Sequence, residues 1–445
     1  MFSRIVVLST LLTVVGIALE VAAQTREEKV REDRRKVEAE GFWIYNNLPL
    51  AFETAKKNGK PILVVLRCIP CEECVKLDDE LVEQDEVIRP LLDKFVCARV
   101  VSTNGLDLSL FQYDTDQSFA VFFLNADKAI YGRFGTRSHR TDWLGDVSLK
   151  GLAAAMQGAL ELHASYPANA KSLSAKRGPK PDVASPELYP SLKDKYTDSL
   201  NYADNNVVKS CIHCHQIGDA QRDMVRARGE PLPESLLFPY PHPKSIGLIL
   251  DPNQRATVKA VPAETPAARA GFKAGDMIES LAGQPLLSIA DVQWILHQTP
   301  ATGGEIAARI KRDGAAQDLT LELGSGWRQA DDISWRVSSW GLRRMTTGGM
   351  LLKQATAEQR QDAGVADGKM ALHVEHVGQY GAHAAAKNAG VQKGDILIAF
   401  DGRTDLVREA DIFRQGMSER KPGQRVPITV SRNGKQIQLQ LPIQE

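Results

Sequence analysis

Apolar residues follow two different patterns along the chain, and the change between them divides the sequence into parts. From about residue 42 to residue 163, apolar runs alternate with stretches of helical spacing, and the clearest runs are 62–66, 95–101 and 119–124. Buried strands that alternate with helices are typical of an α/β domain. From about residue 240 onwards, shorter strands are separated by turns that contain glycine. The sequence therefore predicts a multidomain protein with an α/β domain followed by β-rich domains.

The first 23 residues have the order of an export signal. Arg4 is followed by an apolar run from Ile5 to Leu19 and by small residues that end at Ala23. This order is typical of a secretory signal peptide, and we expect cleavage after Ala23. An uncleaved anchor is the alternative, although the run is shorter than the roughly 20 residues that span hydrocarbon. We therefore expect an exported protein, periplasmic or secreted, whose mature chain has no membrane span.

Composition indicates the character of three further segments. Residues 24–41 are mostly charged, which predicts a solvated helix or arm without a catalytic role. Residues 164–197 are rich in Pro, Ala, Ser and Lys and predict a linker, and residues 198–239 form a short segment that contains two cysteines. Lys and Arg total 55 and Asp and Glu total 55, so no net positive charge is available to attract nucleic acid.

The β-rich part contains an internal duplication. Residues 267–278 and 386–397 share the pattern A-x-x-A-G-[FV]-x-x-G-D-[MI]-[IL]. Each copy continues with a glycine seven residues after its aspartate and then with a hairpin signal, Asp-Gly in the first copy and Asn-Gly in the second. These dipeptides supply the positive φ angles of a tight hairpin. Each copy therefore predicts a small domain closed by a hairpin, with bounds of 240–326 and 333–445.

The duplicated run resembles bacterial PDZ domains, in particular those of the high-temperature-requirement family of periplasmic proteases. The resemblance implies that a peptide C-terminus adds as a strand and that N–H groups of a glycine loop bind its carboxylate. The matching candidate ligand-binding residues are Ile246, Gly247 and Leu248 in the first copy and Trp340, Gly341 and Leu342 in the second. The sequence G-x-S-G-G does not occur in the chain, so we expect peptide binding without serine protease activity. Domains that only pack on their neighbours are the alternative.

A buried strand that begins at Ile62 leads into three cysteines, Cys68, Cys71 and Cys74. A C-x-x-C pair that follows such a strand resembles thioredoxin, and the helix before the strand is similar to that of periplasmic reductases. The resemblance covers roughly residues 42–163 and offers two registers. The count from Ile62 favours Cys71 as the nucleophile and Cys74 as the resolving thiol, with Cys68 at the edge of the motif.

Departures from the thioredoxin pattern put the activity of this domain in question. Phe119 stands where thioredoxins have a cis-proline, and Pro70 stands where the tryptophan before the first cysteine is expected. Glu72 and Glu73 disfavour a thiolate beside them. We therefore expect an altered substrate groove. A structural disulfide is one alternative, and a four-thiolate metal site that includes Cys97 is another.

Residues 211–215 read C-I-H-C-H, which is the pattern of covalent haem attachment. The pattern predicts one haem c held through thioethers to Cys211 and Cys214, with His215 as an iron ligand. Met224 and His242 are the nearest candidates for the sixth ligand. A disulfide between the two cysteines and a zinc half-site with His213 and His215 are the alternatives.

Together these motifs predict an exported thiol-disulfide or electron-transfer protein. Its fold class is a thioredoxin-like α/β domain, a short helical segment with the haem motif, and two PDZ domains. Its partners would be protein or peptide C-termini and a redox partner protein. A periplasmic scaffold or redox sensor with structural cysteines is the non-enzymatic alternative.

Overall fold

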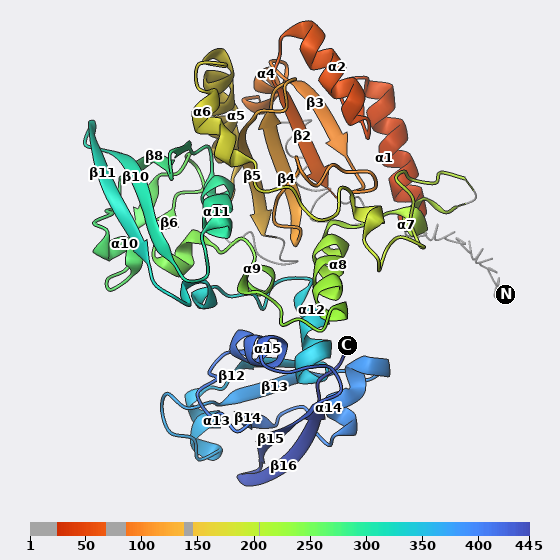
Figure 1. The fold of residues 1–445 in the computed structure, drawn as a ribbon, viewed down its shortest axis with the longest axis vertical. Helices are drawn as coiled ribbons and strands as arrows, with labels where there is room; N and C mark the ends of the chain where they lie inside the picture. Colours follow the sequence, from red (N-terminus) through yellow and green to blue (C-terminus); the bar gives the residue numbers. More distant parts are fainter. Residues whose placement is uncertain (1–24, 68–85, 138–145, 204) are drawn as a thin grey trace, which may run out of the picture.

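The computed structural model describes residues 25–67, 86–137, 146–203 and 205–445 (Figure 1). Cys68, Cys71, Cys74 and the expected export signal lie outside the described residues. Within the described part of the chain, no helix has both the length and the apolar character needed to cross a membrane.

A five-stranded sheet forms the core of the N-terminal domain, in the order β1-β3-β2-β4-β5. Its strands are β1 (Ile44–Tyr45), β2 (Ile62–Arg67), β3 (Val96–Val100), β4 (Gln117–Leu124) and β5 (Ile130–Arg137). Strands β2 and β3 are parallel, and β4 is antiparallel to β2. Every residue of β2 is buried, as expected for a strand covered on both faces. The α/β prediction is confirmed.

Helices cover both faces of this sheet. Helices α4 (Ile88–Leu92) and α5 (Leu149–Ala164) share one hydrophobic cluster with alternate residues of β2, such as Leu63. Helix α2 (Leu48–Asn58) shares the opposite cluster with Val64. The alternation of side chains along a strand explains why neighbouring residues of β2 serve different cores.

Helix α1 (Arg26–Glu40) has only Val30 and Val37 buried, as expected for a solvated helix, but it is also bonded to the rest of the chain. Asp33 forms an ion pair with Arg67, the last residue of β2, and accepts a hydrogen bond from the Tyr45 hydroxyl at 2.9 Å. Glu27 accepts the N–H groups of Val207 and Val208, at 3.2 and 3.1 Å, at the start of helix α7. The acidic side chains of the arm therefore bind the ends of other elements, which composition alone does not reveal.

The segment expected as a linker packs against the sheet. Helix α6 (Ala170–Leu173) contributes Leu173 to the core shared with α5. Lys176, in the short helix η1 (Ser174–Lys176), is fully buried and forms an ion pair with Asp291 at 3.0 Å. A buried lysine requires a charged partner, and here that partner, Asp291, belongs to the first repeat. The segment therefore forms part of the interface between the two domains.

The two sequence repeats fold into two sheet-rich domains. The first contains β6 (Ile249–Leu250), β7 (Val258–Ala260), α10 (Pro266–Arg269), β8 (Met277–Leu281), β9 (Gln284–Pro285), α11 (Ile289–Gln298), β10 (Gly304–Arg312) and β11 (Ala315–Leu323). The second contains β12 (Met350–Gln354), α13 (Ala357–Asp362), β13 (Leu372–Val377), α14 (Ala385–Asn388), β14 (Ile396–Phe400), α15 (Glu409–Ser418), β15 (Arg425–Arg432) and β16 (Lys435–Pro442). The remaining helices are η2 (Pro186–Leu188), α7 (Val207–Ser210), α8 (Cys214–Ala227), α9 (Glu234–Leu237), η3 (Pro243–Ile246), η4 (Trp327–Ala330), α12 (Ser339–Leu342), η5 (Arg343–Thr347) and, inside the second repeat, η6 (Gly381–Ala384).

The same internal ion pair occurs in both repeats. Arg312 donates to both carboxylate oxygens of Asp276, at 2.6 and 2.7 Å, and Arg432 makes the same pair with Asp395, at 2.7 and 2.8 Å. The predicted hairpins are present, because both residues of each turn have positive φ, for example 51° and 83° at Asp313-Gly314. In each repeat the buried aspartate precedes one strand (β8 or β14) and pairs with the last residue of the strand that enters the hairpin (β10 or β15). This ion pair explains why the aspartate recurs in the repeated pattern.

The first repeat docks onto the exposed edge of the thioredoxin-like sheet. Strand β5 is an edge strand, and helix α11 lies against it (Figure 1). The Arg133 N–H donates to Asp291 at 3.1 Å, and the Ser288 hydroxyl donates to the Arg133 carbonyl at 2.6 Å. Side chains thereby satisfy backbone groups that an unpaired edge would leave open to association with other chains.

A second polar contact joins the same two domains. The Lys244 ammonium donates to Asp146 at 2.7 Å, and His242 Nε2 lies 3.2 Å from the same oxygen. Burial alone would raise the pKa of Asp146, but the hydrogen bonds from His242 and Lys244 outweigh burial and hold the pKa well below its usual range. The ionised form of Asp146 therefore stabilises the docked arrangement.

This contact predicts a specific acid sensitivity. A carboxyl whose pKa is lower in the folded state stabilises the fold above its unfolded pKa of about 4, and this stabilisation is lost as the pH falls. We expect Asp146→Asn to lower stability at neutral pH and to weaken its pH dependence below about pH 4. Urea denaturation at a series of pH values measures both effects. Asp318→Asn, in an exposed ion pair, is the control; an unchanged pH profile in Asp146→Asn would contradict the assignment.

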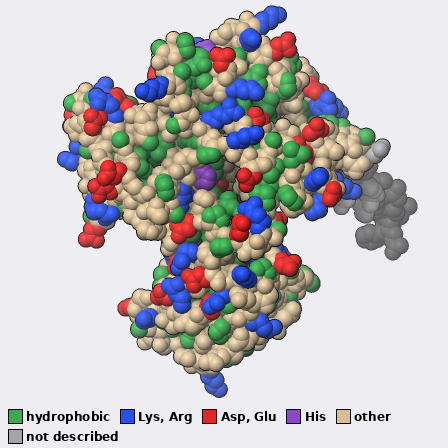
Figure 2. Space-filling view, viewed as in Figure 1, with side chains coloured by type: hydrophobic (Ala, Val, Ile, Leu, Met, Phe, Trp, Pro, Cys, Tyr) green, Lys and Arg blue, Asp and Glu red, His purple; other side chains and the backbone are tan. Residues whose placement is uncertain are grey.

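The second repeat is joined to the thioredoxin-like domain through residues that precede its first strand, β12. Arg336 donates to Asp114 at 2.6 Å and to Asp116 at 3.3 Å, both in the loop that precedes β4. The Ser338 hydroxyl donates to Asp116 at 2.7 Å. Charges of both signs are interspersed over the visible face of the assembled chain (Figure 2), in agreement with its zero net charge.

Candidate functional site

The cysteine motif at residues 211–215 lies at the carboxyl end of β2 and β3. Leu66 and Arg67 from β2, and Val100 and Val101 from β3 and its end, line a cavity together with the motif. The cavity is about 10 Å³, which is room for about one water molecule. Cys68 follows Arg67, the last residue of β2, directly in the sequence, and the first cysteine motif itself lies outside the described residues.

Two residues beyond β3 hold the motif in place. The Thr103 N–H and hydroxyl both donate to the Ile212 carbonyl, at 3.1 and 2.9 Å. The Asn104 side chain accepts the Ile212 N–H at 2.8 Å and donates to the Ser210 carbonyl at 3.0 Å. The motif is therefore bonded to the thioredoxin-like domain through its backbone, which leaves its side chains for other contacts.

Both cysteines of the motif are free thiols turned toward the protein. Cys211 is 8% exposed, and burial raises its pKa to about 11. Cys214 is half-buried, packs against the core on the α2 face of the sheet, and accepts a hydrogen bond from the Tyr113 hydroxyl at 3.0 Å. Burial also raises the pKa of Cys214, although the Tyr113 hydrogen bond opposes the shift.

The two histidines of the motif stack on each other. The His213 and His215 rings are nearly parallel, with their centroids 5.7 Å apart. Burial, followed by the neighbouring His215, lowers the pKa of His213. Within the described ranges, no group of three or more His, Cys, Asp or Glu side chains is placed to hold a metal ion. Cys97 lies in the core on the other face of the sheet, with its thiol 3.5 Å from the Leu92 carbonyl.

These side chains do not fit a covalent haem. Two thioether bonds require both sulfurs to face the porphyrin edge, whereas Cys214 contacts Tyr113 and Cys211 is buried. His242 is engaged with Asp146, and Met224 lies on the same helix as Cys214, so neither is placed as a distal ligand. The presence of a covalent haem stays a prediction, which a pyridine haemochrome spectrum would test.

The predicted carboxylate loop of the first repeat ends helix η3. Gly247 has a φ of 88°, and an added Cβ there would lie 2.1 Å from the Thr265 hydroxyl, so glycine is required. The N–H groups of Gly247 and Leu248 donate to the Lys244 and Pro243 carbonyls, at 3.1 and 3.0 Å. The expectation of open donors is therefore wrong in this conformation, because the loop closes on its own helical turn.

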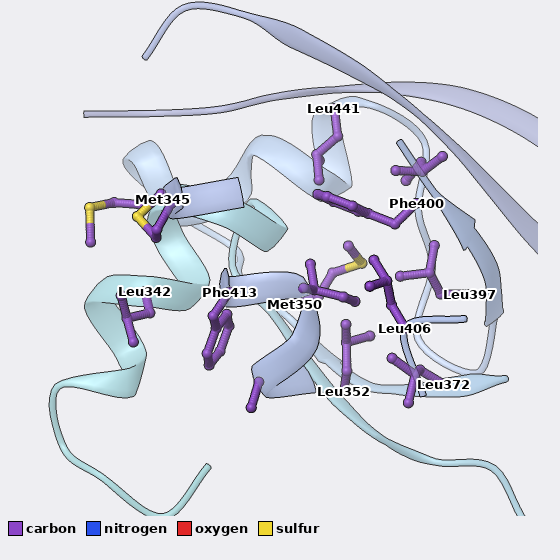
Figure 3. Packing of buried hydrophobic residues seen from close by; sticks show 14 of the residues in the cluster. Leu342, Met345, Met350, Leu352, Leu372, Leu397, Phe400, Leu406, Phe413 and Leu441 are labelled. Atoms are coloured by element: carbon purple, nitrogen blue, oxygen red, sulfur yellow. The ribbon is translucent and has the colours of Figure 1, made fainter. Parts of the chain in front are cut away.

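The predicted loop of the second repeat is a helix. Trp340, Gly341 and Leu342 belong to α12, and the N–H groups of Gly341 and Leu342 both donate to the Ser338 carbonyl. Leu342 packs in the same buried cluster as Met345 and Phe413 (Figure 3). The prediction of a loop here is wrong, because apolar packing on α15 stabilises a helical turn.

A glycine pair directly before β12 occupies the position expected for the carboxylate loop of the second repeat, and the sequence pattern did not identify it. Gly348 and Gly349 have φ angles of 61° and 87° and directly precede β12, as Gly247 precedes the strand region of the first repeat. The Gly-Gly dipeptide was the available sequence signal. The candidate carboxylate loop of the second repeat is therefore the segment 347–350. Like the loop of the first repeat, it is closed on its own helical turn, because the N–H groups of Gly348 and Gly349 both donate to the Arg343 carbonyl.

Replacing Gly341 by alanine tests this reassignment. In a helix the added Cβ meets only Asp219 Oδ1, at 3.8 Å, so we expect a neutral effect or a gain of up to about 1 kcal/mol in stability. Gly349→Ala should destabilise the protein, because its Cβ would lie 2.0 Å from the His383 carbonyl. Thermal denaturation compares the two variants. Equal destabilisation by both would show that Gly341 needs a glycine conformation after all.

A buried ion pair lies beside the open edge of the second repeat. Strand β12 is an edge strand, and the Leu352 N–H, on its open side, donates to Glu409 at 2.9 Å. Arg343 donates to both oxygens of Glu409, at 2.9 and 2.7 Å, and both side chains are buried. The position beside β12 where a peptide strand would add is therefore partly used by Glu409 at the start of α15.

Comparison with known proteins supports part of this organisation. A thioredoxin-like family model matches residues 43–126, and a PDZ domain model matches residues 257–302. A probable periplasmic serine endoprotease DegP-like from Marinomonas sp. is 26% identical over 187 residues, which are 42% of this chain and 36% of that protein. The periplasmic serine endoprotease DegP of Salmonella typhimurium is 30% identical over 149 residues, which are 34% of this chain and 27% of that protein. The chain thus spans about a third of the length of these relatives.

Solved structures give weaker matches. The HtrA-type protease AlgW with decapeptide matches with a TM-score of 0.21 and 19% identity, over 36% of this chain and 45% of that chain. AlgW with tripeptide matches with a TM-score of 0.21 and 15% identity, over 39% of this chain and 55% of that chain. The chain therefore contains a thioredoxin-like domain and, after it, a PDZ domain related in sequence to those of DegP-like proteins.

Proposed function

We propose that this chain is an exported thiol-disulfide protein whose thioredoxin-like domain acts on proteins recruited through PDZ domains. The observation that carries the proposal is the position of the cysteines: one motif follows β2, and the other is bonded beside the same end of the sheet. In thioredoxin-like proteins the reactive cysteine motif follows a buried strand at this end of the sheet. The periplasmic relatives and the N-terminal apolar run support export.

The roles proposed for the first motif follow from its sequence. Cys71 attacks a client disulfide, and Cys74 resolves the mixed disulfide that results. Phe119, in the place expected for a cis-proline, is buried in β4 and lies opposite Arg67 of β2. Strand β4 is therefore an ordinary paired strand at this position, which favours weak and poorly selective turnover.

The second repeat is proposed as a second PDZ domain. It shares the sequence pattern, the hairpin and the aspartate-arginine pair of the first repeat. Its edge strand β12 and helix α15 would form the peptide groove, and Gly348 and Gly349 would provide the carboxylate loop. Protein or peptide C-termini are the partners that this arrangement favours.

Peptide binding tests the proposed recruitment. We expect peptides with free C-termini to bind the full chain at least about tenfold more tightly than the same peptides with amidated ends, because the loop binds the carboxylate. Fluorescence anisotropy with labelled peptides measures this difference. Gly341→Ala should retain binding, and Gly349→Ala should lose it. Equal binding of free and amidated peptides would remove the carboxylate-loop argument.

A non-enzymatic scaffold is the second candidate function. It is favoured by the docking of both repeats on the thioredoxin-like domain through buried ion pairs, which suits a rigid binding platform. The closed loop at Gly247 and the Glu409 contact with β12 also favour domains that pack on their neighbours. In this case the cysteines would be structural, and trapping of a client would fail.

A further inference from the structure

The second cysteine motif has a geometry suited to thiol exchange. Helix α8 is 14 residues long and begins at Cys214, so this sulfur lies at the positive end of the helix dipole. The Tyr113 hydroxyl donates a hydrogen bond to the same sulfur at 3.0 Å. Both contacts favour negative charge on this sulfur during an exchange reaction. Cys211 precedes this helix; a hydrogen bond with Ser102 opposes the rise that burial causes in its pKa.

Access also differs between the two sulfurs. Cys214 is half-buried, whereas Cys211 is buried beside the Val101 carbonyl at 4.0 Å. The cavity next to them is lined by Arg67 and by Ser102, at the ends of β2 and β3. Cys214 is therefore the more exposed of the two residues, and Cys211 lies three residues before it in the chain.

We propose that Cys214 and Cys211 form a second thiol-disulfide pair, in place of a haem attachment site. The Cys214 thiolate attacks one sulfur of a disulfide, forms a mixed disulfide and releases the other sulfur as a thiolate, which takes a proton from solvent. Cys211 loses its proton to solvent and attacks the Cys214 sulfur, which releases the second thiolate and leaves a Cys211–Cys214 disulfide. The substrate disulfide gains two electrons and two protons, and the two cysteines lose them.

The order of the two cysteines is reversed relative to thioredoxin. In that arrangement the first cysteine of the motif lies at the helix start and attacks, whereas here the helix starts at the second cysteine. The proposed Cys214–Cys211 exchange uses residues that the proposed thioredoxin-type activity does not use. Failure of this exchange can therefore be distinguished from failure of the Cys71–Cys74 chemistry.

The test uses the full chain with Cys68, Cys71 and Cys74 replaced by serine, produced in a host with cytochrome c maturation machinery. Glutathione disulfide is the probe. We expect Cys211→Ser in this background to accumulate a mixed disulfide with glutathione at Cys214, and Cys214→Ser to accumulate at least about tenfold less. With both cysteines present, an internal disulfide should form, and Cys97 should stay unmodified as the buried control. Intact-mass and peptide mass spectrometry read out each species.

A conservative variant separates positioning from folding. Tyr113→Phe keeps the ring but removes the hydroxyl donor, so we expect slower trapping at Cys214 and a shift of the pH–rate profile to higher pH. A pyridine haemochrome signal that acid-acetone treatment cannot strip would overturn the proposal in favour of covalent haem. Equal labelling of the two single variants, or no labelling of either, would overturn it as well.

The substrate disulfide has two possible sources with the same chemistry. It can belong to this chain, since Cys68 is the next residue in the sequence after Arg67, which lines the cavity, or to a client protein. The arm with Cys68, Cys71 and Cys74 intact distinguishes them. Disulfide-linked peptides that join residues 68–74 to residues 211–214 assign the source to the chain itself, and their absence, with glutathione trapping retained, assigns it to a client.

Discussion

Replacing Arg336 by methionine is expected to destabilise the protein by about 3–5 kcal/mol. Arg336 is 1% exposed and pairs with Asp114 and Asp116, whose side chains are 3% and 4% exposed. It also donates to the Pro239 carbonyl at 2.5 Å. Methionine leaves two carboxylates buried without their counterion, and the second repeat loses its main polar attachment to the loop before β4.

Chemical denaturation and limited proteolysis measure this effect. The control is Arg309→Met, because the Arg309–Asp318 pair is 52% and 75% exposed and should be worth at most about 1 kcal/mol. Proteolysis should become faster between the two repeats in Arg336→Met only. Equal and small effects of both variants would show that the buried pair does not hold the domains together.

Asp291→Ala is expected to cost a similar amount, about 3–5 kcal/mol, at the other interface. Asp291 accepts the N–H groups of Arg133 and Leu287, at 3.1 and 2.9 Å, and pairs with the fully buried Lys176. Burial lowers the pKa of Lys176, and Asp291 opposes that shift. Alanine leaves the ammonium without its counterion and exposes the edge of β5.

Separation of the first repeat from the thioredoxin-like sheet is the specific consequence. We expect small-angle X-ray scattering to show a larger radius of gyration for Asp291→Ala, together with a greater tendency to associate through the freed edge. Asp318→Ala, which removes an exposed carboxylate, should leave the wild-type scattering profile unchanged. An unchanged radius in Asp291→Ala would contradict the role of this carboxylate in docking.

Local signals predicted the elements of the fold well. The buried run at residues 62–66 became β2, and the Asp313-Gly314 and Asn433-Gly434 dipeptides became hairpin turns. Such features depend on residues that are neighbours in sequence. Docking depends on residues far apart, such as Arg336 and Asp114, which are 222 positions from each other, and no local pattern indicates that they meet.

The candidate site shows the same division. Spacing alone identified the motif at residues 211–215, but the environment of its sulfurs is set by Tyr113, 101 residues before Cys214. The Trp340-Gly341-Leu342 tripeptide matched a loop pattern, yet packing of Leu342 made it helical. A short motif fixes which chemical groups are available, and tertiary packing decides which of them are open.

Trapping of a client on the first cysteine motif tests the central claim most directly. With Cys211 and Cys214 replaced by serine, the Cys74→Ser variant should accumulate mixed disulfides with exported proteins that carry free C-termini, and Cys71→Ser should not. If Cys68 is the nucleophile, Cys71→Ser becomes the trapping variant and Cys74→Ser behaves as the parent protein. If none of the three single variants at Cys68, Cys71 and Cys74 traps a partner and the reduced protein shows no reactive thiol in this motif, the thiol-disulfide function is contradicted and the chain is a scaffold.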